Sequence, residues 1–374
     1  MASHGRYLLP QVKKDLTRKM VFVSGPRQVG KTTMARALPG GKTGYLTWDD
    51  AEDRERILTQ QLPSSTLWIF DELHKYRQWR NYLKGLYDKR RARQRILVTG
   101  SGRLDFYRFG GDSLQGRYHL LRLHPLSVAE LRLKSQGDLG DLLTLGGFPE
   151  PYWSSSEVEA RRWSRDYRTR LIREDVAGLE RLHDLGHLEL LMLRLPELTG
   201  SPLSINAVRE DLQVAHKTVA NWLDVLERLY AIFRLSPFGA PRIRAVKKEQ
   251  KHYQYDWALV QARGPRFENL VGSHLLKWVH HQVDSQGRDL ELRYFRDTDG
   301  REVDFVVTEH RKPILAVECK LAAGAIDRGI NYFVDKYPGL EAWQVFYEAA
   351  GAKHYQSASG IMHAPVTQLL ERLT

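Results

Sequence analysis

One short glycine-rich segment constrains the fold of this chain more than any other feature. It matches the GxxxxGK[ST] pattern of a phosphate-binding loop and consists of Gly25, Pro26, Arg27, Gln28, Val29, Gly30, Lys31, Thr32 and Thr33. The apolar run 20–23 precedes the loop, and residues 34–38, which favour a helix, follow it. In that order the loop N–H groups and the helix N-terminus converge on phosphate groups. The pattern predicts a strand, a nucleotide-binding loop and a helix. The competing interpretation is a glycine-rich turn with a chance lysine.

The loop and the next apolar run carry residues with different expected roles in phosphoryl transfer. Lys31 is expected to reach the β- and γ-phosphates of ATP, and the Thr32 hydroxyl is expected to hold Mg²⁺. The apolar run 67–70 ends in Asp71 and Glu72. A carboxylate at a strand end can hold the Mg²⁺ shell, and the next one can polarise the attacking water. We therefore interpret Asp71 as a metal residue and Glu72 as the general base.

A third apolar run, 96–99, ends in Gly100 and Ser101. If this strand lies between the other two, the Ser101 hydroxyl lies beside the γ-phosphate. Apolar runs alternate with helical patterns over the first third of the chain, which predicts an α/β fold with a doubly wound parallel sheet. The expected strands are 20–24, 44–48, 66–70, 95–100 and 117–123.

Length and composition restrict the class of protein. A chain of 374 residues exceeds what one hydrophobic core organises, so we expect two or three domains. The single cysteine, Cys319, excludes an intramolecular disulfide and cannot build a zinc site by itself. No apolar run approaches the roughly 18 to 20 residues of a membrane span, and the N-terminus lacks a signal-peptide core, so we expect a cytoplasmic protein without a membrane partner.

The net charge of +12 favours a polyanionic partner. Nucleic acid is preferred over a membrane surface, because no helical pattern is both strongly basic and strongly amphipathic. A basic run over 75–95 is interleaved with Tyr76, Trp79, Tyr82 and Tyr87. Either these aromatic side chains pack and leave a solvated charged face, or the run forms a pore-facing or DNA-tracking surface of a ring.

The middle of the chain predicts helices followed by a winged helix. The arginine-rich stretch 157–195 reads as a helical lid. A short helix over 205–212 and a second one from His216 through Leu229 form a helix-turn-helix, and the strand at 233–235 suggests a wing. Winged helices serve either to contact DNA phosphates or to pack against protein. The expected wing-tip cations are Arg242, Arg244, Lys247, Lys248 and Lys251.

The C-terminal third carries a second possible chemistry. Two strand-like runs, 303–307 and 314–320, form a hairpin that sets Asp304 opposite Glu318. Alternation along the strand puts Glu318 and Lys320 on one face and turns Cys319 into the core. Two carboxylates and a lysine can bind Mg²⁺, orient a water and stabilise a pentavalent phosphate. Glu268 is a further oxygen ligand for this metal. The alternative is an ordinary salt-bridged hairpin.

With these motifs in place, the chain resembles the prokaryotic AAA-class ATPases whose C-terminal domain of unknown function is similar to restriction endonucleases. The resemblance extends over nearly the whole chain. It is carried by the phosphate loop, Asp71-Glu72, Thr99-Gly100-Ser101, Ser113-Leu114-Gln115-Gly116-Arg117, the winged helix, Phe267-Glu268 and the Asp304, Glu318 and Lys320 triad. The family usually has further small hydroxyl residues where this chain has Gly102 and Arg103. This difference affects the assignment of Ser101 as the residue that senses the γ-phosphate.

The resemblance implies a catalytic role for Arg117, as a finger that reaches the nucleotide of a neighbouring subunit. A local salt bridge at a strand start is the other interpretation of Arg117, and Arg173 is the reserve candidate for the finger.

The resulting hypothesis is an Mg²⁺- and ATP-dependent AAA-class ATPase that forms a homo-oligomer, expected to be a ring, and acts on branched or junction DNA in recombination or repair. Its expected domains are an ATPase core (1–136), a helical lid (137–196), a winged helix (197–262) and an endonuclease-like domain (263–374). One alternative is a nucleotide-dependent regulatory switch that binds a protein partner. Another is an Mg²⁺-dependent DNA nuclease coupled to the ATPase.

Overall fold

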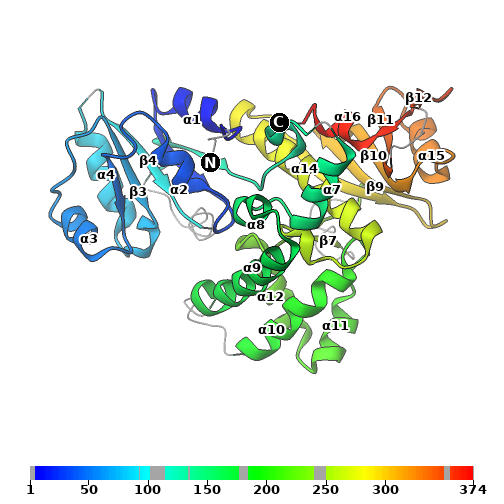
Figure 1. Ribbon diagram of the computed structural model, residues 1–374, viewed down its shortest axis with the longest axis horizontal. Helices are drawn as coiled ribbons and strands as arrows, with labels where there is room; N and C mark the ends of the chain where they lie inside the picture. The colour runs from blue at the N-terminus through cyan, green and yellow to red at the C-terminus, as the bar shows by residue number, and fades with distance from the viewer. Residues whose placement is uncertain are drawn as a thin grey trace. The chain divides into compact units, whose positions relative to one another are not determined.

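The chain divides into two compact units. The structure, a computed structural model, describes residues 5–91, 93–101, 114–133, 135–176, 184–239, 250–348 and 354–373. The first unit contains Met1–Pro125 with two short segments, 228–230 and 284–286, and is drawn mainly in blue and cyan in Figure 1. The second unit contains Leu126–Glu227, Ala231–Val283 and Gly287–Thr374. The lid, winged-helix and endonuclease-like boundaries all fall in or beside the second unit and stay predictions.

A five-stranded parallel sheet forms the centre of the first unit. Its order is β2-β3-β4-β1-β5, and every neighbouring pair is parallel. The predicted α/β fold with a parallel sheet is therefore confirmed, and β4 lies between β1 and β3 as the nucleotide-site hypothesis requires. The strands are β1 (Met20–Ser24), β2 (Tyr45–Thr47), β3 (Leu67–Asp71), β4 (Arg95–Thr99) and β5 (Tyr118–Arg122).

The aromatic residues of the basic run belong to the core of this unit. Tyr76 stacks on Trp48 with ring centroids 4.8 Å apart, and Tyr82 meets the edge of Phe70 at 6.0 Å. Trp79 is 5 % exposed, so the packing interpretation is confirmed for these aromatic side chains. The helices of the unit are α1 (Leu9–Asp15), α2 (Lys31–Arg36), α3 (Ala51–Leu58), the 3₁₀ turn Leu73–Lys75 and α4 (Trp79–Lys89).

The second unit begins with helices and continues into a helix pair with a small sheet. The expected helix-turn-helix appears as α11 (Ile205–Leu212) and α12 (His216–Arg228), with Trp222 buried. Strands β6 (Ile232–Leu235) and β7 (Lys251–Gln254) follow and pair antiparallel. Four of the expected wing cations, Arg242, Arg244, Lys247 and Lys248, lie outside the described residues. The preceding helices are α6 (Val128–Leu131), α7 (Gln136–Leu145), α8 (Pro149–Ser154), α9 (Glu157–Arg170), the π-helical segment Leu171–Val176, α10 (Leu185–Arg194) and the 3₁₀ turn Leu195–Leu198.

A six-stranded mixed sheet completes the second unit. Its order is β12-β13-β11-β10-β9-β8, with β8, β9 and β10 antiparallel and with β10, β11 and β13 parallel. No helix in the described ranges is long and apolar enough to cross a membrane. The elements are the 3₁₀ turn Trp257–Leu259, α14 (Arg263–Gln286), β8 (Leu290–Arg296), β9 (Glu302–Glu309), β10 (Lys312–Ala322), α15 (Arg328–Lys336), β11 (Glu341–Glu348), β12 (Tyr355–Gln356), β13 (Met362–Pro365) and α16 (Val366–Leu370).

The β9–β10 hairpin contains an irregularity that sets its register. His310 and Arg311 form the turn with φ of 48° and 69°. The register shifts between Pro313 and Leu315, and beyond it Val317 pairs with Phe305. The same shift brings Asp304 level with Glu318 at the next position, as expected, through a bulge that the strand pattern did not indicate. Glu318 is 6 % exposed and shares a face with Lys320, whose ammonium donates to it, as expected. Cys319 between them is half-buried, and burial raises the pKa of its thiol.

Two glycines of the first unit provide a matched test of its packing. A Cβ at Gly44 would lie 1.7 Å from the Leu67 carbonyl oxygen, whereas a Cβ at Gly85 in α4 would meet nothing within 4 Å. We expect Gly44→Ala to lower the free energy of unfolding by roughly 1–3 kcal/mol, because the β2–β3 backbone must shift. Gly85→Ala should raise it by about 0.5–1 kcal/mol, because alanine favours the helix. Thermal melts of both variants test this, and an equally stable Gly44→Ala variant would contradict the close approach.

Candidate functional site

The phosphate loop connects β1 to α2 through backbone conformations that favour glycine. Gly25 has φ of 145° and Gly30 has φ of 98°. A Cβ at Gly25 would lie 2.3 Å from the Leu123 carbonyl oxygen, because the chain leaving β5 passes directly against the loop. The Leu123 N–H also donates to the Ser24 carbonyl at 2.8 Å. These contacts give the loop one shape, and they account for both glycines of the motif.

Lys31 lies inside this loop. Its side chain is 7 % exposed, and its ammonium donates to the carbonyl oxygens of Gly25 at 3.0 Å and Pro26 at 2.6 Å. A buried ammonium needs such acceptors, because burial without them costs several kcal/mol. The structure therefore places the predicted phosphate-binding lysine where the loop surrounds its charge.

The Asp71 carboxylate joins four elements at the carboxyl edge of the sheet. Its Oδ2 accepts hydrogen bonds from the Thr32 hydroxyl at 2.8 Å and the Tyr45 hydroxyl at 2.7 Å, and its Oδ1 accepts one from the Thr99 hydroxyl at 2.6 Å. Burial, with the neighbouring Asp71 charge, raises the pKa of Tyr45, so this phenol stays a donor. A hydroxyl oxygen and a carboxylate oxygen at adjacent positions suit Mg²⁺, which prefers oxygen ligands. Thr32 and Asp71 thus fit the predicted metal role.

Tyr45 and Thr99 are partners of Asp71 that the sequence motifs did not reveal. Thr99 is the register partner of Asp71 in the β3–β4 pair, so a correct strand order would have indicated it. Tyr45 comes from β2 at the sheet edge, and its strand pairs Thr47 with Asp71. The phenol reaches the carboxylate from two residues away, and no local pattern signals such a contact.

Glu72 and Ser101 lie together at the ends of β3 and β4. Glu72 has φ of 55°, and its Oε1 accepts a hydrogen bond from the Ser101 N–H at 3.1 Å. Its Oε2 lies 3.5 Å from the Lys75 ammonium. The Ser101 hydroxyl is buried and has no hydrogen-bond partner among the described residues. A buried unpaired hydroxyl costs about 1–3 kcal/mol, so a ligand oxygen at this place would satisfy it.

Arg117 forms a local ion pair. Its Nε lies 3.0 Å from Asp88 Oδ1, directly before the start of β5. This contact is the salt bridge expected as the alternative for Arg117, and the role of a finger in trans stays a prediction. Arg173 lies exposed in the π-helical segment Leu171–Val176. Nothing in the structure selects between the two arginines.

A buried lysine occupies the centre of the carboxylate cluster in the second unit. The Lys251 side chain is 1 % exposed, and its ammonium lies 3.3 Å from Glu268 Oε1, 2.5 Å from Glu302 Oε1 and 3.7 Å from Asp304 Oδ1. Burial alone would lower the pKa of Lys251, but the three carboxylates outweigh it and raise the pKa. The expectation that Lys251 sits at a wing tip is wrong, because β7 carries the side chain into this cluster.

The remaining predicted residues gather beside it. Glu318 Oε2 accepts a hydrogen bond from the Asp304 N–H at 3.3 Å, and the Cys319 N–H donates to Asp304 Oδ2 at 2.9 Å. The Lys320 ammonium donates to Glu318 Oε1 at 2.8 Å and to Asp327 Oδ2 at 2.9 Å. Asp327, the N-cap of α15, was not foreseen.

The Lys251 ammonium faces three carboxylates, so it neutralises only part of the negative charge of the cluster. Burial raises the pKa of Glu268 and of Glu318, and the nearby Asp304 adds to both shifts. The Lys251 ammonium faces the oxygens of Glu268 and Asp304 that a metal would need. In the part of the chain that the structure describes, no group of three or more His, Cys, Asp or Glu side chains is arranged to hold a metal ion. A metal ion at the site predicted from Glu268, Asp304 and Glu318 would therefore compete with the Lys251 ammonium for carboxylate oxygens.

We expect Lys251→Met to destabilise the second unit strongly. Removing one partner of a buried ion cluster leaves uncompensated charge and costs about 3–5 kcal/mol, which thermal or urea unfolding measures. Mn²⁺ should raise the melting temperature of this variant more than that of the parent, because the freed carboxylates then offer oxygen ligands. Lys320→Met is the control, since the Lys320 side chain is 36 % exposed and its removal should cost less. Equal stability of Lys251→Met and the parent would contradict the compensating role.

Comparisons with known proteins agree with the site in the first unit. Residues 17–132 match the family described as AAA domain, and residues 136–267 and 263–368 match two families described as domains of unknown function, DUF8612 and DUF4143. Uncharacterized proteins of Mycobacterium bovis and Mycobacterium tuberculosis are each 27% identical over 312 residues, covering 79% of this chain and 68% of the relative.

Two solved structures align with part of this chain. A Walker-type ATPase of Pyrococcus abyssi is 14% identical with a TM-score of 0.42, over 67% of this chain and 93% of that one. A RuvB variant of Thermotoga maritima is 16% identical with a TM-score of 0.31, over 61% of this chain and 88% of that one. The AAA-domain match covers the phosphate loop and the Asp71 site, and together they support an ATPase of the AAA class.

Proposed function

We propose that this chain is an Mg²⁺- and ATP-dependent ATPase that assembles into a homo-oligomeric ring and acts on DNA, branched or junction DNA in recombination or repair. The observation that carries the ATPase part is the hydrogen bond of 2.8 Å between the Thr32 hydroxyl and Asp71. It joins the end of the phosphate loop to the acidic strand end, which is the pair of groups that Mg²⁺-dependent phosphoryl transfer needs.

Each loop and strand-end residue has a distinct role in this proposal. Lys31 and the loop N–H groups hold the phosphates, and Thr32 with Asp71 holds Mg²⁺, which supplies positive charge to the transferring phosphoryl group when bound. Glu72 orients and polarises the attacking water. The Ser101 hydroxyl, buried without a hydrogen-bond partner in the described ranges, faces the γ-phosphate. Arg117 of a neighbouring subunit would complete the site, after release from Asp88.

The DNA part of the proposal is supported by charge and by the helix pair. The net charge of +12 attracts polyanions without regard to sequence. Helices α11 and α12, followed by the antiparallel β6–β7 pair, have the element order of a winged helix. A winged helix places its second helix or its wing against DNA phosphates.

A regulatory switch is the second candidate, and one observation favours it. Lys251 faces carboxylate oxygens of Glu268 and Asp304 that a catalytic metal would use, which favours a second unit without metal chemistry. In this proposal the nucleotide state of the first unit controls a protein partner. The nuclease alternative has no such support, because Lys251 faces the carboxylate oxygens that a catalytic metal needs.

Lys31→Ala should abolish ATP hydrolysis, and Glu72→Gln should still bind ATP but hydrolyse it at least about tenfold more slowly. The reason is that Lys31 holds phosphates, whereas removal of a general base typically costs about 10²-fold or more in rate. Nucleotide binding by calorimetry and phosphate release measure the two effects separately. Lys13→Ala and Glu52→Gln, at exposed positions of α1 and α3, are matched controls. Near-normal turnover by Glu72→Gln would remove Glu72 from the role of base.

DNA should stimulate the ATPase, because an enzyme that acts on DNA couples hydrolysis to that contact. We would measure turnover without DNA and with duplex, single-stranded and four-way-junction DNA, and use Lys31→Ala to subtract background hydrolysis. Strongest stimulation by the junction is the expected result. Equal rates under all four conditions would reject action on DNA and favour the regulatory switch.

A further inference from the structure

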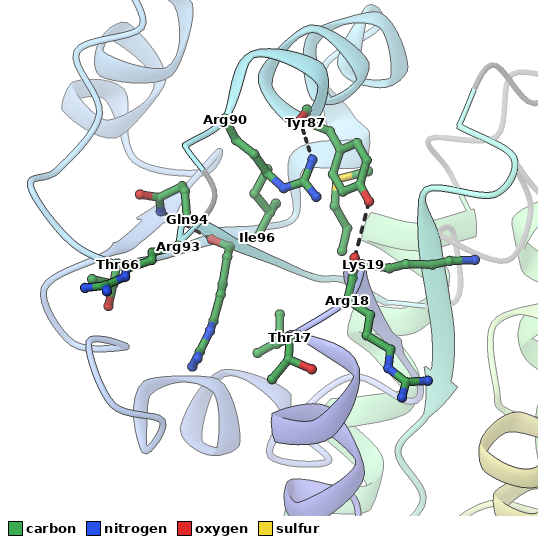
Figure 2. A pocket seen from close by; sticks show the side chains of 12 residues that line it. Thr17, Arg18, Lys19, Thr66, Tyr87, Arg90, Arg93, Gln94 and Ile96 are labelled. Carbon is green, nitrogen blue, oxygen red and sulfur yellow. Dashed lines mark hydrogen bonds between the residues drawn. The ribbon is translucent and has the colours of Figure 1, made fainter.

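A cationic cavity lies at the edge of the first unit's sheet opposite the phosphate loop. The loop follows the end of β1 at Ser24, whereas the cavity is lined by Met20 and Arg95, where β1 and β4 begin. It has a volume of about 350 Å³. Figure 2 shows Arg18, Lys19, Arg90 and Arg93 around it. The strand direction therefore separates this cavity from the nucleotide site by the length of the sheet.

A second cavity adjoins the first. Its volume is about 860 Å³, and it shares Thr66, Arg90, Arg93 and Gln94 with the first cavity, so the two form one continuous groove. Among the described residues, no acidic side chain lines either cavity. The cations of this basic groove are Arg18, Lys19, Lys89, Arg90, Arg91, Arg93 and Arg95.

These cations have little counter-charge among the described residues, and the acidic neighbour Asp88 interacts electrostatically with Arg90. In the described ranges no carboxylate pairs with a cation of the basic groove, whereas Arg161, Arg162 and Arg165 on α9 all have carboxylate partners. The acid of α4 nearest in sequence, Asp88, pairs with Arg117. Like charges gathered without counter-charge repel one another, so an anion in the groove is favoured.

Two contacts hold the walls of the basic groove in place. The Arg90 guanidinium lies 3.4 Å from the centroid of the Tyr87 ring and donates to the Tyr87 carbonyl at 2.5 Å. The Tyr87 hydroxyl donates to the Arg18 carbonyl at 3.5 Å, a long contact that bridges α4 and the segment before β1 (Figure 2). The groove is thus formed by elements that pack on the sheet.

We propose that the basic groove binds the sugar-phosphate backbone of DNA at several successive phosphates. The inference rests on the proposed function, because it names the surface of the ATPase unit that contacts DNA. The cations come from two segments, 18–19 and 89–95, and they extend along two adjoining cavities. A single phosphate would need cations that converge on one point, whereas a phosphate backbone needs cations in a row.

The basic groove is connected to the phosphate loop through the strands of the sheet. Strand β1 begins at the groove and ends at the phosphate loop, and β4 begins at Arg95 and ends next to Ser101. The same two buried strands therefore join the DNA-binding edge to the nucleotide-binding edge. This surface is separate from the expected wing, so replacement of the wing cations would leave DNA binding by the groove in place.

The test compares two triple variants that remove the same charge. Arg18→Ala, Arg93→Ala and Arg95→Ala together remove three exposed cations from the basic groove, and Arg161→Ala, Arg162→Ala and Arg165→Ala remove three paired ones from α9. Affinity for a fluorescent duplex would be measured by anisotropy over a series of salt concentrations. The slope of log affinity against log salt should fall by about 0.9 for each phosphate that the groove variant no longer binds and stay unchanged in the α9 variant.

The outcomes separate this inference from the proposed function. Absence of DNA binding by the parent chain would reject action on DNA itself. Parent binding with an unchanged slope in the groove variant, or with an equal decrease in both triple variants, would overturn the groove inference and leave the proposed function standing. Displacement of DNA by inorganic phosphate at equal ionic strength would show a single-phosphate site and also overturn it. A groove variant with lysine at the three positions should restore the slope, which excludes misfolding as the cause of a decrease.

Discussion

The hydrogen bonds to Asp71 are the interaction on which the ATPase unit depends. Three hydroxyls, from Thr32, Tyr45 and Thr99, satisfy a carboxylate that is 8 % exposed, and they connect α2, β2 and β4 to the end of β3. Hydrogen bonds to an ionised group are stronger than neutral ones, so this junction aligns the strand ends. Because the donors are neutral, the negative charge of Asp71 stays available for a cation that binds with the nucleotide.

In the second unit, the carboxylates around Lys251 have a charged donor in place of neutral hydroxyls. Here the carboxylates of Glu268, Glu302 and Asp304 surround a buried ammonium from their own chain. The positive charge is covalently attached and needs no ligand, so the cluster gains order without gaining a cation site. A buried carboxylate thus meets neutral hydroxyl donors in the first unit and a lysine ammonium in the second, and the difference is the type of donor that each fold brings to it.

The parallel sheet of the first unit has two chemically distinct edges, one at the phosphate loop and one at the basic groove. Parallel strands direct all their carboxyl ends to one edge, which collects the phosphate loop, Asp71 and Ser101. Their amino ends meet at the other edge, where Arg18, Arg93 and Arg95 surround the groove. Both edges collect cationic or N–H groups suited to phosphate, the loop and a lysine at one edge and long exposed side chains at the other. The sheet direction is the physical reason that these two sets of groups lie apart.

Local features of this protein could be predicted from its sequence. The phosphate loop, the five strands of the first sheet and the helix pair α11–α12 follow from patterns within a few residues, because apolar periodicity and glycine placement act locally. How distant segments meet depends on the tertiary structure. The β7 strand buries Lys251 among carboxylates, and strand order brings Tyr45 to Asp71. The Asp304–Glu318 pairing was expected from the hairpin, but the bulge after Pro313 that sets its register was not. Such contacts depend on register and strand order, which long-range packing selects and no short pattern records.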